Sequence, residues 1–145
     1  MKPDLSDRPL DCVVEATVPL TADAIYHAWT RAFDSWFAAE GSVIMAGEVG
    51  TTYCFETEMD GKRHPHYGRF LRLVPNELVE MTWMTGNGTA EGTAGAETVL
   101  RVELTPKGDA TELRLIHSGL PTEKSRDGHQ ENWPLALEGL DEALS

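Results

Sequence analysis

Between residues 52 and 117 the chain repeats one pattern, in which apolar and polar side chains alternate along short runs. The alternation is clearest at 53–59, 79–83 and 113–117, and turn-forming residues such as those of Asp60-Gly61 separate the runs. A period of two places every second side chain on one face of a strand, and Asp-Gly is a strong hairpin signal. The pattern predicts a meander of about five or six antiparallel strands with one apolar face.

A first strand and two helical segments are expected ahead of this meander. Residues 12–18 alternate in the same way, and Thr21 is placed to cap a helix at 22–32. Strands and helices therefore occupy separate stretches of the chain, which is typical of the α+β class. A second, short helical piece is expected to carry three further residues, Ser35, Trp36 and Phe37.

The end of the chain contains an amphipathic helical segment, which is the only long element available to cover the apolar face of a sheet. Its apolar side chains recur at helical spacing: Trp133, Leu137, Leu140 and Leu144. Asp127 and Gln130 have the spacing of a capping box. Because Pro134 cannot donate to residue 130 and would clash there, the sequence predicts a kink or a start near Asn132.

Size and charge limit the possible location and partners of the protein. The 145 residues suit one domain over 1–145, with residues 1–10 flexible. A net charge of −12 disfavours nucleic acid and anionic membranes as partners. No apolar run reaches the length of a membrane span and no signal core is present, so we expect a cytoplasmic protein without membrane insertion. Cys12 and Cys54 are expected to be buried free thiols.

The predicted inward face combines aromatic, aliphatic, methionine and histidine side chains. Such a mixture suits a ligand pocket, and it equally suits a solid core, so both interpretations stay open on composition alone. The inward candidates are Tyr53, Phe55, Phe70, Met81, Trp83, Leu100, Leu113, His117, Trp133 and Leu137.

Five segments in order resemble the START-like superfamily, also called SRPBCC or birch-pollen-allergen-like. They are PLTADAIYHAWT at 19–30, SWF at 35–37, YGRFLRLVPNELVEMTW at 67–83, ATELRLIHSGLP at 110–121 and HQENWPLALEGLDEAL at 129–144. The branch they resemble contains proteins similar to the C-terminal domain of the activator of heat shock protein 90 ATPase. The chain departs from that branch at Asn132, where glycine is usual, at Pro134, and at Arg72, where the signature has an acid.

The resemblance implies a helix-grip fold, in which a curved antiparallel sheet of six or seven strands surrounds a long C-terminal helix. Two short helices would lie between the first two strands. It also implies a cavity for a hydrophobic small molecule between sheet and helix, and it adds Trp36 and Phe37 to the expected lining. Because the chain has no room for the large N-terminal domain of the eukaryotic co-chaperone, co-chaperone activity is not expected.

Recognisable catalytic and cofactor motifs are missing from the sequence, and no nucleophile, base and orienting group occur in a known pattern. His117 is expected to be a hydrogen-bonded core residue, with acid–base catalysis as the alternative. His64-Pro65-His66 offers two imidazoles without a third metal ligand nearby, so neither a metal nor a cofactor is expected. Arg72 is expected to be solvated, or else to pair with a ligand carboxylate.

The sequence therefore favours a protein that binds a small hydrophobic, aromatic or lipid-like molecule. One alternative is a cyclase-like or hydrolase-like enzyme that uses the same cavity, with His117 as its acid–base. A second alternative is a chaperone-associated stress-response protein. A homodimer is possible, because small domains of this kind often dimerise.

Overall fold

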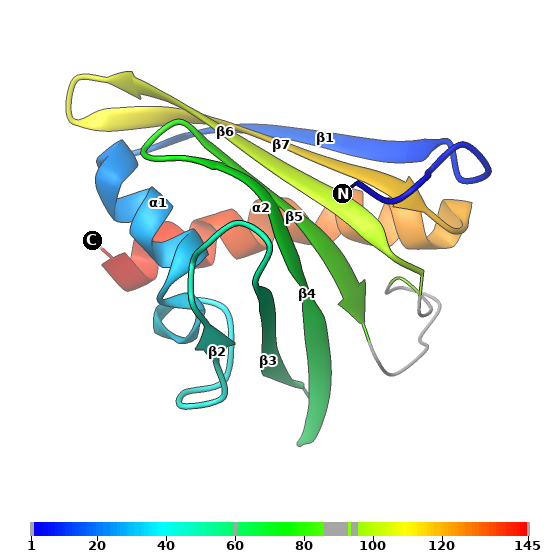
Figure 1. The fold of residues 1–145 in the computed structure, drawn as a ribbon. Coiled ribbons are helices and arrows are strands. Elements are labelled where there is room, and N and C mark those ends of the chain that lie inside the picture. Colours follow the sequence, from blue (N-terminus) through cyan, green and yellow to red (C-terminus); the bar gives the residue numbers. More distant parts are fainter. Residues whose placement is uncertain (1, 60, 86–92, 94–95, 145) are drawn as a thin grey trace.

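The computed structural model describes residues 2–59, 61–85, 93 and 96–144 and contains one antiparallel sheet and two α-helices (Figure 1). Asp60 of the expected hairpin and most of the glycine-rich segment between 85 and 96 lie outside the described residues. The elements are β1 (Leu10–Val18), α1 (Ala22–Thr30), a 3₁₀ turn η1 (Phe33–Ser35), β2 (Ile44–Met45), β3 (Thr52–Met59), β4 (Lys62–Val74), β5 (Leu78–Thr85), β6 (Thr98–Lys107), β7 (Ala110–Leu120) and α2 (Glu123–Leu144).

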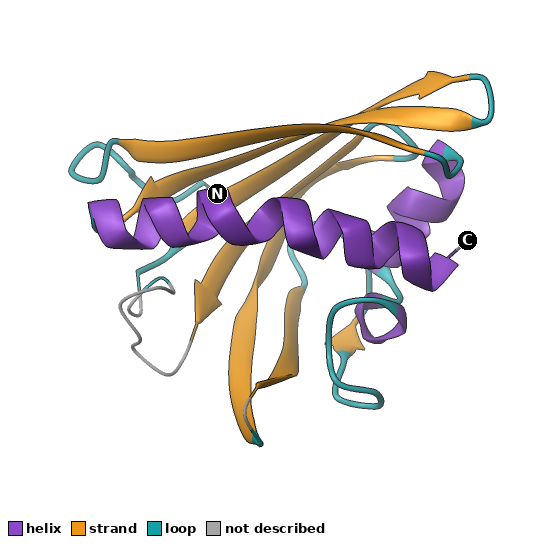
Figure 2. Cartoon of the chain, turned by 180° about the vertical axis from the view of Figure 1, so that it is seen from behind, coloured by secondary structure: helices purple, strands orange, loops and turns teal. Residues whose placement is uncertain are grey.

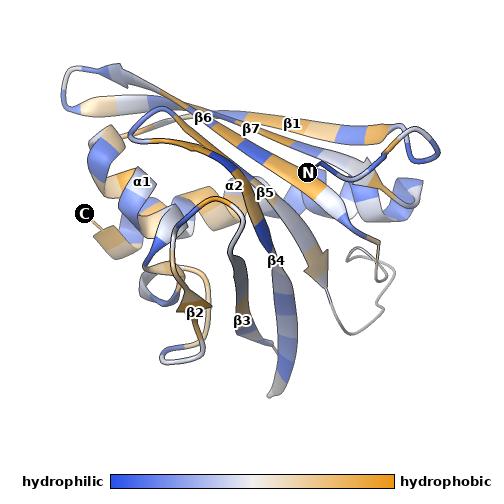
Figure 3. Cartoon of the chain, in the orientation of Figure 1, coloured by the Kyte–Doolittle hydropathy of each residue, from blue (hydrophilic) through white to orange (hydrophobic). Residues whose placement is uncertain are grey.

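The seven strands are ordered β1-β7-β6-β5-β4-β3-β2, and every neighbouring pair is antiparallel. The sheet curves around α2, while α1 and η1 lie near the C-terminal end of that helix (Figure 2). This arrangement confirms the predicted α+β helix-grip fold, including the two short helical pieces between the first two strands. Hydrophobic and hydrophilic residues alternate along strands such as β1 and β6, as Figure 3 shows.

The first helix follows from its N-terminal cap. Thr21 has an extended backbone, and its side chain accepts a hydrogen bond from the Ala24 N–H at 3.2 Å, as expected for an N-cap. The apolar face of this helix is buried and includes Ile25, Ala28 and Trp29. The helix ends at Thr30, two residues before the predicted end.

The second helix begins earlier than the sequence predicted. Thr122 is its cap, since its hydroxyl accepts from the Ser125 N–H at 3.0 Å, so the capping box at Asp127 and the start near Asn132 were wrong. The helix continues through Pro134, whose side chain is exposed. Proline in a helix costs about 3 kcal/mol, and each large apolar side chain buried on the same helix recovers roughly 1.5–3 kcal/mol. The buried stripe thus offsets the proline.

The core lies between the concave face of the sheet and α2. Cross-strand pairing aligns one row of inward side chains across five strands, and each is 2% exposed or less: Cys12, His117, Leu100, Met81 and Phe70. Trp133, Leu137 and Leu140 of α2 cover this face. Among the described residues, neither helix combines the length and hydrophobicity that crossing a lipid bilayer requires.

The segment before β1 contacts the far end of β7. The Arg8 guanidinium donates to the carbonyl of Gly119 at 2.9 Å and to that of Glu97 at 2.7 Å. Lys2 lies 3.3 Å from the buried carboxylate of Glu80. Flexibility of residues 1–10 stays a prediction.

Gly68 allows β4 and β5 to approach each other closely. A Cβ at this position would overlap the backbone carbonyl of Thr82 and lie 2.7 Å from its hydroxyl oxygen. The Thr82 hydroxyl also accepts from the Arg69 N–H at 3.0 Å, and the Thr82 carbonyl accepts from the Tyr53 hydroxyl at 2.5 Å. The position therefore tolerates no side chain without a shift of the backbone.

We expect Gly68→Ala to lower the free energy of unfolding by about 1–3 kcal/mol, because the methyl group meets backbone atoms that cannot rotate away. Gly139→Ala is the matched control, since the nearest atom to its new Cβ is the Trp36 carbonyl oxygen at 4.0 Å. There the higher helix propensity of alanine should raise stability by up to about 1 kcal/mol. Urea denaturation measures both, and equal stability of Gly68→Ala and the parent would contradict the close approach.

Candidate functional site

The structure brings the predicted inward residues together. All ten of the strand and helix positions expected to face inward are 3% exposed or less; nine belong to one hydrophobic core, the tenth is the buried His117, and Trp36 and Phe37 pack half-buried against the core. The ten are Tyr53, Phe55, Phe70, Met81, Trp83, Leu100, Leu113, His117, Trp133 and Leu137. Their role in ligand binding stays a prediction.

Aromatic rings fill the interior at the end nearest α1. Phe33 stacks on Phe55 with ring centroids 4.8 Å apart, and Trp83 meets Trp133 edge-to-face at 5.3 Å. Phe33 also contacts Trp29 at 5.2 Å. Phe33 was not among the predicted site residues; it lies in η1, beyond the end of α1. This end of the interior is a packed core.

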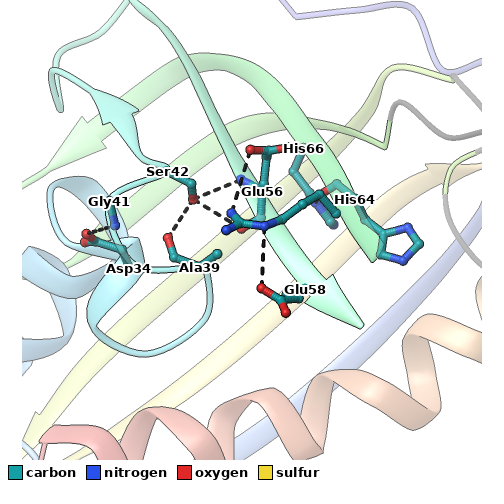
Figure 4. A network of polar contacts seen from close by, with 9 residues as sticks. Asp34, Ala39, Gly41, Ser42, Glu56, Glu58, His64 and His66 are labelled. Atoms are coloured by element: carbon teal, nitrogen blue, oxygen red, sulfur yellow. Dashed lines mark hydrogen bonds and ion pairs between the residues drawn. The ribbon is translucent and has the colours of Figure 1, made fainter. Parts of the chain in front are cut away.

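The loop after η1 holds Phe37 over β3. The Ala39 N–H donates to the Glu56 carbonyl at 2.7 Å, and the Ser42 hydroxyl oxygen accepts from the Glu56 N–H at 3.1 Å (Figure 4). The same hydroxyl lies 2.7 Å from the Ala39 carbonyl oxygen. Phe37 consequently contacts Phe55, with centroids 5.8 Å apart.

His117 has both ring nitrogens engaged in the interior. The indole of Trp133 can only donate, so its Nε1–H donates to Nδ1 of His117 at 3.1 Å. The neutral imidazole must then carry its proton on Nε2, which donates to the Thr98 hydroxyl at 2.7 Å. The Thr98 hydroxyl in turn donates to the Trp83 carbonyl at 2.5 Å. This chain of bonds joins α2, β7, β6 and β5 and leaves His117 no free nitrogen for acid–base chemistry.

Two other histidines lie at the edge of the interior with one ring nitrogen unused. The Nδ1–H of His66 donates to the His64 carbonyl at 3.1 Å, and the Nδ1–H of His129 donates to the Ser125 carbonyl at 2.7 Å. Within the described part of the chain, neither Nε2 takes part in a hydrogen bond. Both side chains are half-buried, so each Nε2 is a bare acceptor near the protein surface.

Burial keeps these imidazoles neutral. Desolvation, together with the neighbouring His64 and His129, lowers the pKa of His66 to about 4. Desolvation and the nearby His129 hold the pKa of His117 well below its usual range. Burial also lowers the pKa of His129, against the opposing effect of its bond to Ser125. All three are therefore uncharged at neutral pH.

His66 and His129 were not predicted as site residues. His66 had been considered with His64 as a metal pair, but among the described residues no three potential ligands converge to hold a metal ion. His66 of β4 pairs with Phe55 of β3, and paired residues point to the same face of the sheet. The inward position of Phe55, which the alternation in β3 predicts, therefore also indicates an inward His66. His129 is brought close to His117 by the early start of α2, and their ring centroids are 4.6 Å apart.

Two other sequence candidates lie on the outer face of the sheet. Cys54 is exposed, which corrects the expectation of a buried thiol, because it alternates with the inward Tyr53 and Phe55. Cys12 is buried, and both cysteines are free. Arg72 is exposed, as expected for a solvated strand residue.

Two depressions of about 400 Å³ also lie on the outer face. One is lined mainly by charged and polar residues of β1, β6 and β7, among them Glu15, Glu103 and Arg114. The other is lined by residues of β2 to β5, among them Ile44 and Tyr67. Neither lies between the sheet and α2.

Comparison with known proteins identifies related sequences and folds. The family model for the activator of Hsp90 ATPase homologue 1-like proteins matches residues 19–145. No curated protein matches the chain in sequence. Protein CV1439 from Chromobacterium violaceum has a similar fold, with a TM-score of 0.78 and 21% identity over 94% of this chain and 98% of that one.

Two further solved structures share the fold. The Aha1 dimer from Colwellia psychrerythraea has a TM-score of 0.66 and 21% identity over 93% of this chain and 96% of that one. DynU16, a protein of the dynemicin biosynthetic locus, has a TM-score of 0.69 and 19% identity over 92% of this chain and 46% of that one. At these identities the similarity shows the fold alone.

We expect Thr98→Val to lower the free energy of unfolding by about 1–3 kcal/mol, because the buried His117 Nε2–H then has no acceptor while the shape of the side chain is kept. Thr105→Val, at an exposed position of the same strand, is the control and should change stability by less than about 0.5 kcal/mol. Chemical denaturation compares them. Equal effects at the two positions would mean that the buried chain of bonds contributes nothing.

Stability should fall as the pH drops below about 6.5, where the histidines of an unfolded chain take up protons. His66, His117 and His129 have lowered pKa values in the folded state, so in this range the unfolded chain binds more protons than the folded one. Each histidine can contribute at most about 1.4 kcal/mol per pH unit. Urea denaturation between pH 7.5 and 5.5 should show a weaker dependence for His66→Gln. His27→Gln is the control, because His27 is exposed. If stability depends on pH equally in His66→Gln, in His27→Gln and in the parent, then His66 does not contribute to that dependence.

Proposed function

The chain belongs to the family of activator of Hsp90 ATPase homologue 1-like proteins, and from that premise we propose that it binds a small, largely apolar aromatic molecule between the sheet and α2. The observation that carries the proposal is a group of half-buried rings at the edge of a fully buried aromatic core. This group consists of Trp36, Phe37, His66 and His129. We call it the rim.

The rim suits an aromatic ligand because its members already form ring contacts with the core. Phe37 lies 6.1 Å from Trp133 and 5.9 Å from Trp83, measured between ring centroids, and His66 lies 5.2 Å from Trp83. Aromatic pairs at such distances add roughly 0.5–1.5 kcal/mol beyond the burial of area. A flat ligand that packs against the half-exposed Phe37 ring would add a contact of the same kind.

The polar contacts favour binding over catalysis. A cyclase or hydrolase that used His117 as its acid–base would need a ring nitrogen free to exchange a proton with substrate. Both nitrogens of His117 are held by Trp133 and Thr98. We therefore place the enzymatic alternative second.

The dimeric form of the Colwellia protein supports a further proposal, that this chain also forms a homodimer. A cytoplasmic location likewise remains a proposal. Neither is required by ligand binding at the rim, which each copy of the chain carries in full.

Ligand binding can be tested with three neutral probes: a naphthalene derivative, a steroid and a long-chain alcohol. The naphthalene derivative should raise the melting temperature most, because its flat rings can form aromatic contacts with the rim. At a hundredfold excess over its Kd, a ligand stabilises a protein by about 2.7 kcal/mol. Phe37→Ala should weaken that binding at least about tenfold, since it removes a ring contact worth about 1 kcal/mol together with buried area.

Leu135→Ala is the control, because Leu135 is 60% exposed and does not belong to the core. It should leave the affinity for the naphthalene derivative unchanged. If none of the three probes shifts the melting temperature, or if both variants weaken binding equally, the proposed site is wrong.

A further inference from the structure

We propose that the rim selects an aromatic molecule carrying an acidic group, and that its binding is coupled to the uptake of protons by His66 and His129. This inference rests on the proposed function and specifies the ligand class of the same site. It starts from the hydrogen bonds of two imidazoles, one on β4 and the other on α2.

The first step is the state of the two rings. In each, Nδ1 carries the proton and donates to a backbone carbonyl, that of His64 or that of Ser125. Each Nε2 therefore has a lone pair and can take up one proton. Once protonated, it becomes a charged donor, and such donors form short, strong hydrogen bonds with carboxylates.

The second step is the arrangement of the two rings around the aromatic core. His66 contacts Trp83 at 5.2 Å, and His129 contacts His117 at 4.6 Å. His117 itself lies 6.4 Å from Trp83. His66 thus lies beside Trp83 and His129 beside His117, near enough for His129 to influence the protonation of His66, and the half-buried Phe37 adjoins His66 at 6.0 Å. A ligand ring packed against Phe37 would present its substituent toward His66, and His129 is the second imidazole of the rim.

The third step is the lack of a counter-ion for these histidines. Among the described residues, the groups around His66 include His64 on its own strand, Phe55 of β3, Trp83 and Thr85 of β5, Phe37 and His129. His129 faces His117, which pairs with Cys12 of β1. Among the described residues, no carboxylate affects the protonation of His66 or His129.

Charged side chains on the neighbouring strand and on α2 pair with one another. Glu56 and Glu58 of β3 lie within 4 Å of Arg63, at 3.8 Å and 3.5 Å respectively. On α2, Arg126 donates to Asp127 at 3.1 Å. A proton on His66 or His129 therefore gains no compensating charge from these residues, and it is retained only when an anion arrives from outside.

A weak acid supplies that charge. Its carboxylate accepts from the Nε2–H of one or both imidazoles, and each proton comes from solvent when the complex forms at neutral pH. Because the net charge of −12 repels anions in general, the imidazoles provide a local exception within an acidic protein. Affinity for the acid should then rise as the pH falls, by up to about tenfold per pH unit for each histidine protonated on binding.

The test compares 2-naphthoic acid with 2-naphthamide, which has the same shape without a charge. Isothermal titration calorimetry at pH 6, 7 and 8, in two buffers of different ionisation enthalpy, gives the affinity and the number of protons taken up. A carboxyl group titrates near pH 4, so the probe remains ionised over this range and any pH dependence belongs to the protein. We expect proton uptake and tighter binding at pH 6 for naphthoate, and neither for naphthamide.

Variants assign the protons to residues. His66→Gln and His129→Gln should each reduce the proton uptake and flatten the pH dependence for naphthoate, and whatever affinity for naphthamide each variant retains should be the same at pH 6 and pH 8. His27→Gln is the matched control, because His27 is exposed on α1. It should behave as the parent with both probes, and circular dichroism checks that each variant is folded.

The possible failures are distinct. If both probes bind with equal affinity and without proton uptake, the rim binds aromatic molecules and the selection of acids is wrong. If proton uptake persists unchanged in both histidine variants, the assignment to these residues is wrong. If neither probe binds at any pH, the proposed function fails together with the inference.

Discussion

The hydrogen bond from the Trp133 indole to His117 is the contact on which the joining of sheet and helix depends. In the described part of the chain, this bond joins a polar group of α2 to a polar group of the sheet within the buried interior, with both side chains 3% exposed or less. Buried donors and acceptors without partners cost about 1–3 kcal/mol each, so this geometry specifies one register between helix and sheet. Sliding α2 by one turn would bury an unpaired indole and an unpaired imidazole together.

The same contact explains why the interior contains neutral histidines. An indole only donates, so the bond exists only while His117 Nδ1 is unprotonated. Protonation of His117 would replace an acceptor by a donor facing another donor, in a region where charge is already disfavoured by burial. His66 and His129 lie farther out, where burial lowers their pKa values but leaves one nitrogen of each unpaired among the described residues. The fully buried His117 is therefore structural, whereas the less deeply buried His66 and His129 can take up protons.

The sequence predicted the sheet and its inward residues well, because a period of two depends only on neighbouring positions. The rule also applied to Cys54, which lies between the inward Tyr53 and Phe55, and the expectation of a buried thiol failed because it went against that alternation. The start of α2 was mispredicted, since the effect of Pro134 was weighed locally while the burial that offsets it comes from the sheet. Trp36 and Phe37 of the rim were among the expected lining residues, whereas His66 and His129 were missed because their places follow only once β-pairing and helix docking are both known.

Charge on the two faces of the sheet is organised in opposite ways. On the outer face several acids have basic partners: Glu80 is 4% exposed and lies 3.2 Å from Arg101, which also bonds Glu103 at 2.9 Å. On the inner face, the titratable groups described near the rim are imidazoles, whose charge follows their surroundings. A fixed cation there would need a permanent counter-ion or an expensive buried charge. Imidazoles let the interior remain apolar when empty and become cationic only in response to an anion, so the same residues serve the stability of the fold and the choice of ligand.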